Sequence, residues 1–173
     1  MAIITLLPNS TETTHTSHWQ VYGEATHHEC LDDDNGDTSY VKCSTNFRIM
    51  RIGFANPSVA EADIASIDAV TFLSSGRSTH RTTASNVSIQ FEIPSGFSEA
   101  VSYDPHASNY ETITGTTRTT QPDSSAWTYS ALEGLVMKCT KTSTIEVRLS
   151  YLALKVSYTE AAADNATFFG ANF

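Results

Sequence analysis

The sequence has few basic residues and no long apolar run. Its 10 Lys and Arg residues stand against 19 Asp and Glu residues, which gives a formal net charge of -9. A protein that neutralises nucleic-acid phosphates or lies on an anionic membrane needs clustered cations, so neither partner is expected. The apolar run at residues 2–7 is too short for the core of a signal peptide, and no segment approaches the length that spans a membrane. We therefore expect the chain to be made in the cytoplasm and kept there at first.

Common catalytic motifs are also missing. The sequence has no Gly-rich phosphate loop, no G-x-S-x-G elbow, no H-E-x-x-H helix and no paired C-x-x-C motif. Glycoside hydrolysis needs only two carboxylates that meet in space, but no pair stands out in the sequence. We expect a protein that is not an enzyme and needs no cofactor.

Cysteine is scarce, and the number of cysteines is odd. Cys30, Cys43 and Cys139 occur in a chain without a secretion signal, which favours buried free thiols. A bridge between Cys30 and Cys43 is the alternative, if the strands that carry them pair.

Short segments that alternate apolar and polar residues make up most of the chain. Such segments, typical of strands, occur at residues 19–25, 40–44, 47–54, 67–74, 86–93, 110–117, 135–140 and 145–158. Helix is limited to single turns, at residues 57–66 and 127–135. Eight or nine short strands with turn residues between them predict an all-β fold, a single jelly-roll-like β-sandwich.

The last of these segments, residues 145–158, is the longest. Its apolar residues change phase near Ser150 and Tyr151, which predicts a β-bulge there. Because this strand is unusually long, we expect it to bend and to serve both layers of the sandwich. Residues 135–140 lie only a few positions before it, so the two segments should pair as a hairpin.

The sandwich is expected to span residues 19–159, with an N-terminal arm at 1–18 and a C-terminal tail at 160–173. The arm is rich in Ser, Thr and Pro after a short apolar segment, and the tail ends in three phenylalanines. These phenylalanines can fold back on the body, extend into solvent or insert into a neighbouring subunit, and exposed aromatic side chains on a tether lower solubility unless they are buried. The candidate protein contacts are Ile3, Ile4, Leu6, Leu7, Phe168, Phe169 and Phe173.

Two clusters have residue types that bind metal ions. The acidic turn LDDDNGDTSYV offers Asp32, Asp34 and Asp37, but its glycine lies out of register for a calcium loop and no Glu closes the site. The sequence H-H-x-C at residues 27–30 has no evident fourth zinc ligand. A solvated turn and a structural role are favoured, and no metal is expected.

The two tryptophans, Trp19 and Trp127, can belong to the core or to a surface that stacks on sugars. Each flanks an apolar alternation, which favours the core.

Five segments, in their order along the chain, carry a resemblance. They are the strand led by Trp19, the turn LDDDNGDTSYV, the strands that end in FEIPSG, the segment TTQPDSSAWTYSALEGL and the final strand that ends in KVSYT. Together they resemble a family of jelly-roll-like β-sandwich proteins in the structural modules of tailed bacteriophages. The resemblance covers about residues 19–159, whereas the loop 76–85 and the tail have no counterpart in it.

This resemblance implies a non-enzymatic virion protein, a head decoration (cement) protein that binds and stabilises the shell. Its partners would be the major capsid protein and other copies of itself, as a homotrimer on the capsid exterior. The alternative is a tail-associated module that binds a receptor or a carbohydrate. It would act through exposed aromatic side chains and the loops 76–85 and 104–109.

Overall fold

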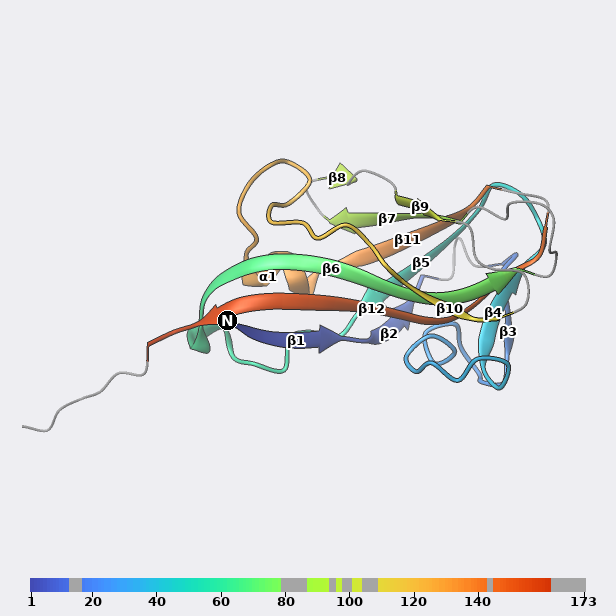
Figure 1. Cartoon of the computed structure of the whole chain (residues 1–173), viewed down its shortest axis with the longest axis horizontal. Coiled ribbons are helices and arrows are strands. Elements are labelled where there is room, and N and C mark those ends of the chain that lie inside the picture. Colours follow the sequence, from blue (N-terminus) through green and yellow to red (C-terminus); the bar gives the residue numbers. More distant parts are fainter. Residues whose placement is uncertain are drawn as a thin grey trace, which may run out of the picture.

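The computed structural model describes residues 1–12, 17–78, 87–93, 96–97, 101–103, 109–142 and 145–162, the three short ranges between 87 and 103 by their backbone alone. These residues form two antiparallel sheets that pack face to face around one core (Figure 1). The predicted β-sandwich is therefore confirmed. Among the described residues, no helix has the length and apolar character needed to cross a membrane.

Each sheet has six described strands. Sheet A has the order β10-β6-β12-β4-β3, with β1 also paired to β12, and sheet B has the order β2-β5-β11-β7-β8, with β9 also paired to β7. The strands of sheet A are β1 (Ala2–Leu6), β3 (Gln20–Tyr22), β4 (Tyr40–Cys43), β6 (Ile64–Ser78), β10 (Glu111–Thr114) and β12 (Val147–Glu160). The strands of sheet B are β2 (Pro8–Thr11), β5 (Arg48–Phe54), β7 (Val87–Ile93), β8 (Gly96–Phe97), β9 (Val101–Tyr103) and β11 (Val136–Lys141).

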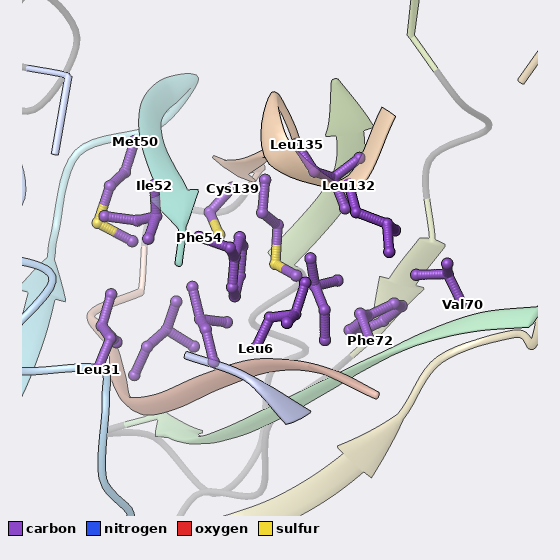
Figure 2. Packing of buried hydrophobic residues seen from close by; sticks show 14 of the residues in the cluster. Leu6, Leu31, Met50, Ile52, Phe54, Val70, Phe72, Leu132, Leu135 and Cys139 are labelled. Carbon is purple, nitrogen blue, oxygen red and sulfur yellow. The ribbon is translucent and has the colours of Figure 1, made fainter. Parts of the chain in front are cut away.

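The core lies between the inner faces of the two sheets. Met50 and Ile52 of β5 face Leu6 of β1 and Phe72 of β6 across this space (Figure 2). Along β5 the buried residues alternate with half-buried ones, as a strand with one face on a core requires. The short helix α1 (Tyr129–Glu133) adds Leu132 to the same cluster.

The long final strand has the predicted bulge but stays in one sheet. A register shift between Leu149 and Tyr151 changes the phase of the buried residues. The expectation that this strand serves both layers is wrong, because among the described strands β12 pairs with β1, β4 and β6, all of sheet A. The bulge restores the inward face without the strand leaving its sheet.

The predicted hairpin between the last two long strands is also wrong. β11 lies between β5 and β7 in sheet B, so both of its edges are already paired. β12 is likewise central in sheet A. β11 and β12 therefore lie in different sheets, as Figure 1 shows.

The N-terminal arm is a further correction, because residues 2–11 belong to the sandwich. β4 covers only the first three residues of β12 on one edge, and β1 pairs with the same edge from Leu154 to Tyr158. The chain then crosses to sheet B, where β2 pairs with β5. An apolar strand that completes an otherwise unpaired edge is more stable there than in water.

Most other predicted elements are present with shifted ends. The helical turn expected at 57–66 is the 3-10 helix η1 (Glu61–Asp63), and the turn at 127–135 is α1, capped by the Thr128 hydroxyl. β6 is longer than expected and includes residues 76–78 of the predicted polar loop. Outside the described residues lie the rest of that loop (79–85), residues 104–108 of the other predicted binding loop, and residues 163–173 of the tail.

Gly23 ends β3 and turns the chain into the long loop before β4. Its φ is +94°, and a Cβ atom there would lie 2.2 Å from the Thr38 carbonyl oxygen. We expect Gly23→Ala to lower the free energy of unfolding by about 1–3 kcal/mol, since strain and a backbone clash add. Urea unfolding measures this loss. An unchanged stability would mean that the loop does not pack against the end of β3 in this way.

Candidate functional site

Sheet A presents a row of cationic side chains on the face away from the core. Val41 of β4 points into the core, so its neighbours Tyr40 and Lys42 lie on the opposite face. In register, Lys42 is paired with Arg148 of β12, and Arg148 is paired with Arg77 of β6. Three cations therefore stand side by side across three strands.

Two tyrosines stack beside this row. Tyr22 of β3 and Tyr40 of β4 are cross-strand partners, and their ring centroids are 4.7 Å apart with an interplanar angle of 21°. The guanidinium carbon of Arg148 lies 4.7 Å from the Tyr40 centroid. Tyr40 is 6% exposed, whereas Tyr22 is 54% exposed. In this stack the Tyr40 ring is buried and the Tyr22 ring is exposed to solvent.

Carboxylates hold the two arginines in place. Asp37, from the acidic turn, accepts from Arg77 at 2.6 Å and lies 3.4 Å from Arg148. Glu146 accepts from the Nε of Arg148 at 3.0 Å. Bonds to carboxylates on two sides fix the guanidinium of Arg148 over the Tyr40 ring. We call Tyr22, Tyr40, Lys42, Arg77 and Arg148 the tyrosine–arginine face.

The acidic turn packs against this face. The Arg77 guanidinium carbon lies 5.2 Å from the Tyr110 ring centroid, and Gly36 lies over the same ring. Burial, together with the nearby Asp37 carboxylate, raises the pKa of the Tyr110 hydroxyl to about 12. Asp37 ties the turn to the sheet through its bonds to both arginines. In Figure 1 the turn lies at the end of the sandwich away from the N-terminus.

The three aspartates considered as metal ligands have different surroundings. Asp37 binds the arginines, whereas Asp34 accepts from the buried Ser150 hydroxyl at 3.0 Å. Burial, and then the charge of Asp33, raise the pKa of Asp32. Among the described residues, no group of three or more His, Cys, Asp or Glu side chains is placed to hold a metal ion. The turn acts here as a cover for the sheet.

The side chains of the H-H-x-C segment bond to three different places. His27 Nε2 lies 2.6 Å from the Trp19 carbonyl oxygen, and His28 Nδ1 lies 3.1 Å from the Thr11 hydroxyl. The Cys30 thiol points to the Tyr22 carbonyl oxygen at 3.5 Å. These contacts fasten the loop between β3 and β4 to the body of the sandwich.

The cysteines and tryptophans are placed as the sequence predicts. Cys30, Cys43 and Cys139 are buried free thiols, so the alternative bridge does not form. Trp19 and Trp127 are 2% and 5% exposed, which confirms that they are core residues. The Trp127 indole also donates to the Arg118 carbonyl oxygen at 2.9 Å. Neither indole presents an open surface to a sugar.

The predicted protein contacts near the N-terminus divide into two groups. Leu6 is 2% exposed and belongs to the core, and Ile4 packs against it. Ile3 and Leu7 are 50% and 39% exposed. Ile3 and Leu7 are therefore the most exposed of the four, whereas Ile4 is half-buried. Phe168, Phe169 and Phe173 lie outside the described residues.

Sequence reasoning missed the tyrosine–arginine face itself. The signal was present in part: Tyr40 and Lys42 alternate with apolar residues along one strand, and so do Arg148 and its neighbours. Which residues of different strands are adjacent depends on the sheet order, however. The sequence does not specify that order, so it does not predict the row of cations on β4, β12 and β6.

No protein-family model matches the sequence, and no curated protein matches it. Solved structures with a similar fold include the C-terminal CBM6 of LamC, a marine laminarinase from Zobellia galactanivorans. The TM-score is 0.48, with 10% identity over 90% of this chain and 100% of that one. The CBM22-1 xylan-binding domain of Xyn10C from Paenibacillus barcinonensis gives 0.43, with 8% identity over 92% and 95%.

Enzymes of carbohydrate metabolism also occur among these structures. Arabinose-bound MgGH51 α-L-arabinofuranosidase gives a TM-score of 0.45, with 12% identity over 88% of this chain but 26% of the enzyme. The structural neighbours thus include carbohydrate-binding modules and a part of a larger glycosidase.

Proposed function

We propose that this protein is a non-enzymatic binding domain that recognises a saccharide through the tyrosine–arginine face. The observation that carries the proposal is the Tyr22 ring, which is 54% exposed and stacked on a buried partner. A sugar ring places its apolar C–H groups on such an aromatic surface, while its hydroxyls need donors and acceptors at the rim. The guanidinium of Arg148 and the carboxylate of Asp37 are groups of that kind.

The face is organised before any ligand arrives. The Tyr40 ring stacks against one face of the Tyr22 ring, and the Arg148 guanidinium packs on the Tyr40 ring. Glu146 and Asp37 hold Arg148 from two sides. Side chains that are already ordered lose little entropy on binding, so a small contact area can still give measurable affinity.

The test is binding of the full chain to a glycan array, followed by calorimetry with the saccharides that bind. We expect Tyr22→Ala to weaken binding by about tenfold, which corresponds to about 1.4 kcal/mol. Tyr22→Phe keeps the ring and should bind almost as well as the unaltered protein. Because Tyr22 is on a three-residue edge strand and half exposed, neither change should alter the melting temperature much. An array without a hit, or equal affinity of the alanine variant, would refute the proposal.

A second candidate function is attachment to a virion shell, as the sequence resemblance implies. The observation that favours it is the apolar edge strand β1, in which Ile3 is 50% exposed; Met1, just before the strand, is 89% exposed. β1 pairs with β12 on one side, and among the described strands it has no partner on the other. Such an edge can accept a strand from a neighbour, either the major capsid protein or another copy in a homotrimer.

The measurement for this candidate is the copy number of the protein in purified particles relative to the major capsid protein. A ratio near one, or a simple fraction of it, is expected of a decoration protein on the capsid exterior. A few copies per particle would place it in the tail, where saccharide binding has a use. Absence from particles would exclude a virion role.

A further inference from the structure

The tyrosine–arginine face has an excess of positive charge in an acidic protein. The chain has a formal net charge of -9, yet Lys42, Arg148 and Arg77 lie next to one another on three strands. Two carboxylates, Asp37 and Glu146, are bonded to the arginines. One positive charge is therefore left over on a molecule that is negative as a whole.

That charge belongs to Lys42. Within the described part of the chain, no carboxylate forms an ion pair with the Lys42 ammonium group. The cross-strand neighbours of Lys42 are Gln20 and Arg148, and neither is acidic. Lys42 is half buried. Lysines in such positions pack their stem on the surface and keep the cationic end in water. Placing two cations side by side is unfavourable unless an anion lies between them. The arrangement suits a negatively charged group at Lys42.

Tyr22 and Lys42 occupy diagonal positions on one face of the β3–β4 pair. Tyr22 is opposite Tyr40, and Lys42 is two residues further along β4 on the same face. Two residues of a strand span roughly 7 Å. A long side chain can reach across such a diagonal, so an acidic substituent of a saccharide bound at Tyr22 can lie near Lys42.

We propose that the ligand is an anionic saccharide whose carboxylate or sulfate group binds at Lys42 beside Arg148. This inference rests on the proposed saccharide binding and adds the charge of the ligand. The carboxylate clamp on Arg148 and Arg77 leaves Lys42 as the cation that takes the ligand's anion. Attraction between opposite charges then selects acidic over neutral sugars with the same ring.

The experiment compares three β-1,4-linked tetrasaccharides that differ at C6: mannotetraose, the mannuronate tetramer and 6-sulfated mannotetraose. Calorimetry with the full chain at low salt should give at least one acidic tetramer about tenfold higher affinity than the neutral one. The difference should shrink when the salt concentration is raised. The mannuronate and the sulfated tetramer separate the two possible sources of the negative charge.

Two lysine variants make the test specific. Lys42→Gln should abolish the preference for the acidic tetramer. Lys155→Gln should keep it, because Lys155 is exposed on β12 but lies seven residues from Arg148, roughly 20 Å along the strand. Equal loss in both variants would mean that only the net charge matters, and would overturn the inference.

The glycan array with neutral and acidic saccharides separates failure of this inference from failure of the proposed function. Binding to neutral saccharides alone, or a neutral tetramer that binds as well as its acidic counterparts, overturns the anionic preference and leaves saccharide binding intact. An array without any hit refutes both.

Discussion

Replacing Leu6 by alanine is expected to lower the free energy of unfolding by about 2–5 kcal/mol, the usual cost of a leucine removed from a core. Leu6 is 2% exposed and packs between the two sheets (Figure 2). An alanine would leave a cavity at the point where the chain crosses from β1 to β2. Urea unfolding followed by circular dichroism measures the loss.

The control is Ile3→Ala on the same strand. Ile3 is 50% exposed and its side chain is on the other face of β1, so its loss should change stability by about 0.5 kcal/mol or less. If residues 1–18 formed a detached arm, the two variants would be equally harmless. A large effect of Leu6→Ala beside a small one of Ile3→Ala therefore tests the place of β1 in sheet A.

The fold class could be predicted because it depends on local patterns. The alternation along the strands and the change of phase at Ser150 and Tyr151 are properties of consecutive residues, and they gave the β-sandwich and the bulge correctly. Burial of Trp19 and Trp127 followed from their apolar flanks. Each of these depends on the residues within about one strand length.

Errors arose wherever a choice of partner was needed. Proximity in sequence favours a hairpin between residues 135–140 and 145–158, but β5 and β7 occupy both edges of β11. The segment at residues 2–6 is a short apolar run without alternation, and it becomes a strand because it pairs with the free edge of β12. Long-range pairing of this kind is not encoded in any short stretch of sequence.

The tyrosine–arginine face could not be predicted from the sequence for the same reason. Tyr22, Arg77 and Arg148 belong to strands that are far apart in the chain, and they meet only through the order β6-β12-β4-β3. The sequence indicates a polar, acidic turn, but the role of this turn as a clamp on two arginines depends on the order of the strands. Surface sites formed across a sheet are therefore found after the sheet order is known.

Buried thiols should make the protein sensitive to alkaline pH. Burial raises the pKa of Cys139 from its ordinary value of 9.0 to about 12. In the unfolded chain this thiol loses its proton near pH 9, while the folded protein keeps the proton. Above pH 9 the unfolded state binds fewer protons than the folded state, so stability falls as the pH rises.

The expected slope is about 1.4 kcal/mol per pH unit from Cys139 alone, between pH 9 and the folded pKa. Cys43 contributes in the same direction, since burial raises its pKa too. Lys141 acts oppositely below pH 10.5, because burial lowers its pKa and the unfolded state then binds more protons. A comparison of variants that differ at one position removes these other contributions.

Cys139→Ala should therefore lose less stability than the unaltered protein between pH 9 and 11, by about 2–3 kcal/mol over the two units. Met137→Ala is the matched control: Met137 is on the same strand, fully buried and without a titratable group. Its cavity should lower stability by a similar amount at every pH and leave the slope unchanged. Urea unfolding under reducing conditions at several pH values gives both slopes. Parallel pH profiles for the two variants would mean that Cys139 is open to solvent, and that sheets A and B do not enclose the core as tightly as the packing of β11 indicates.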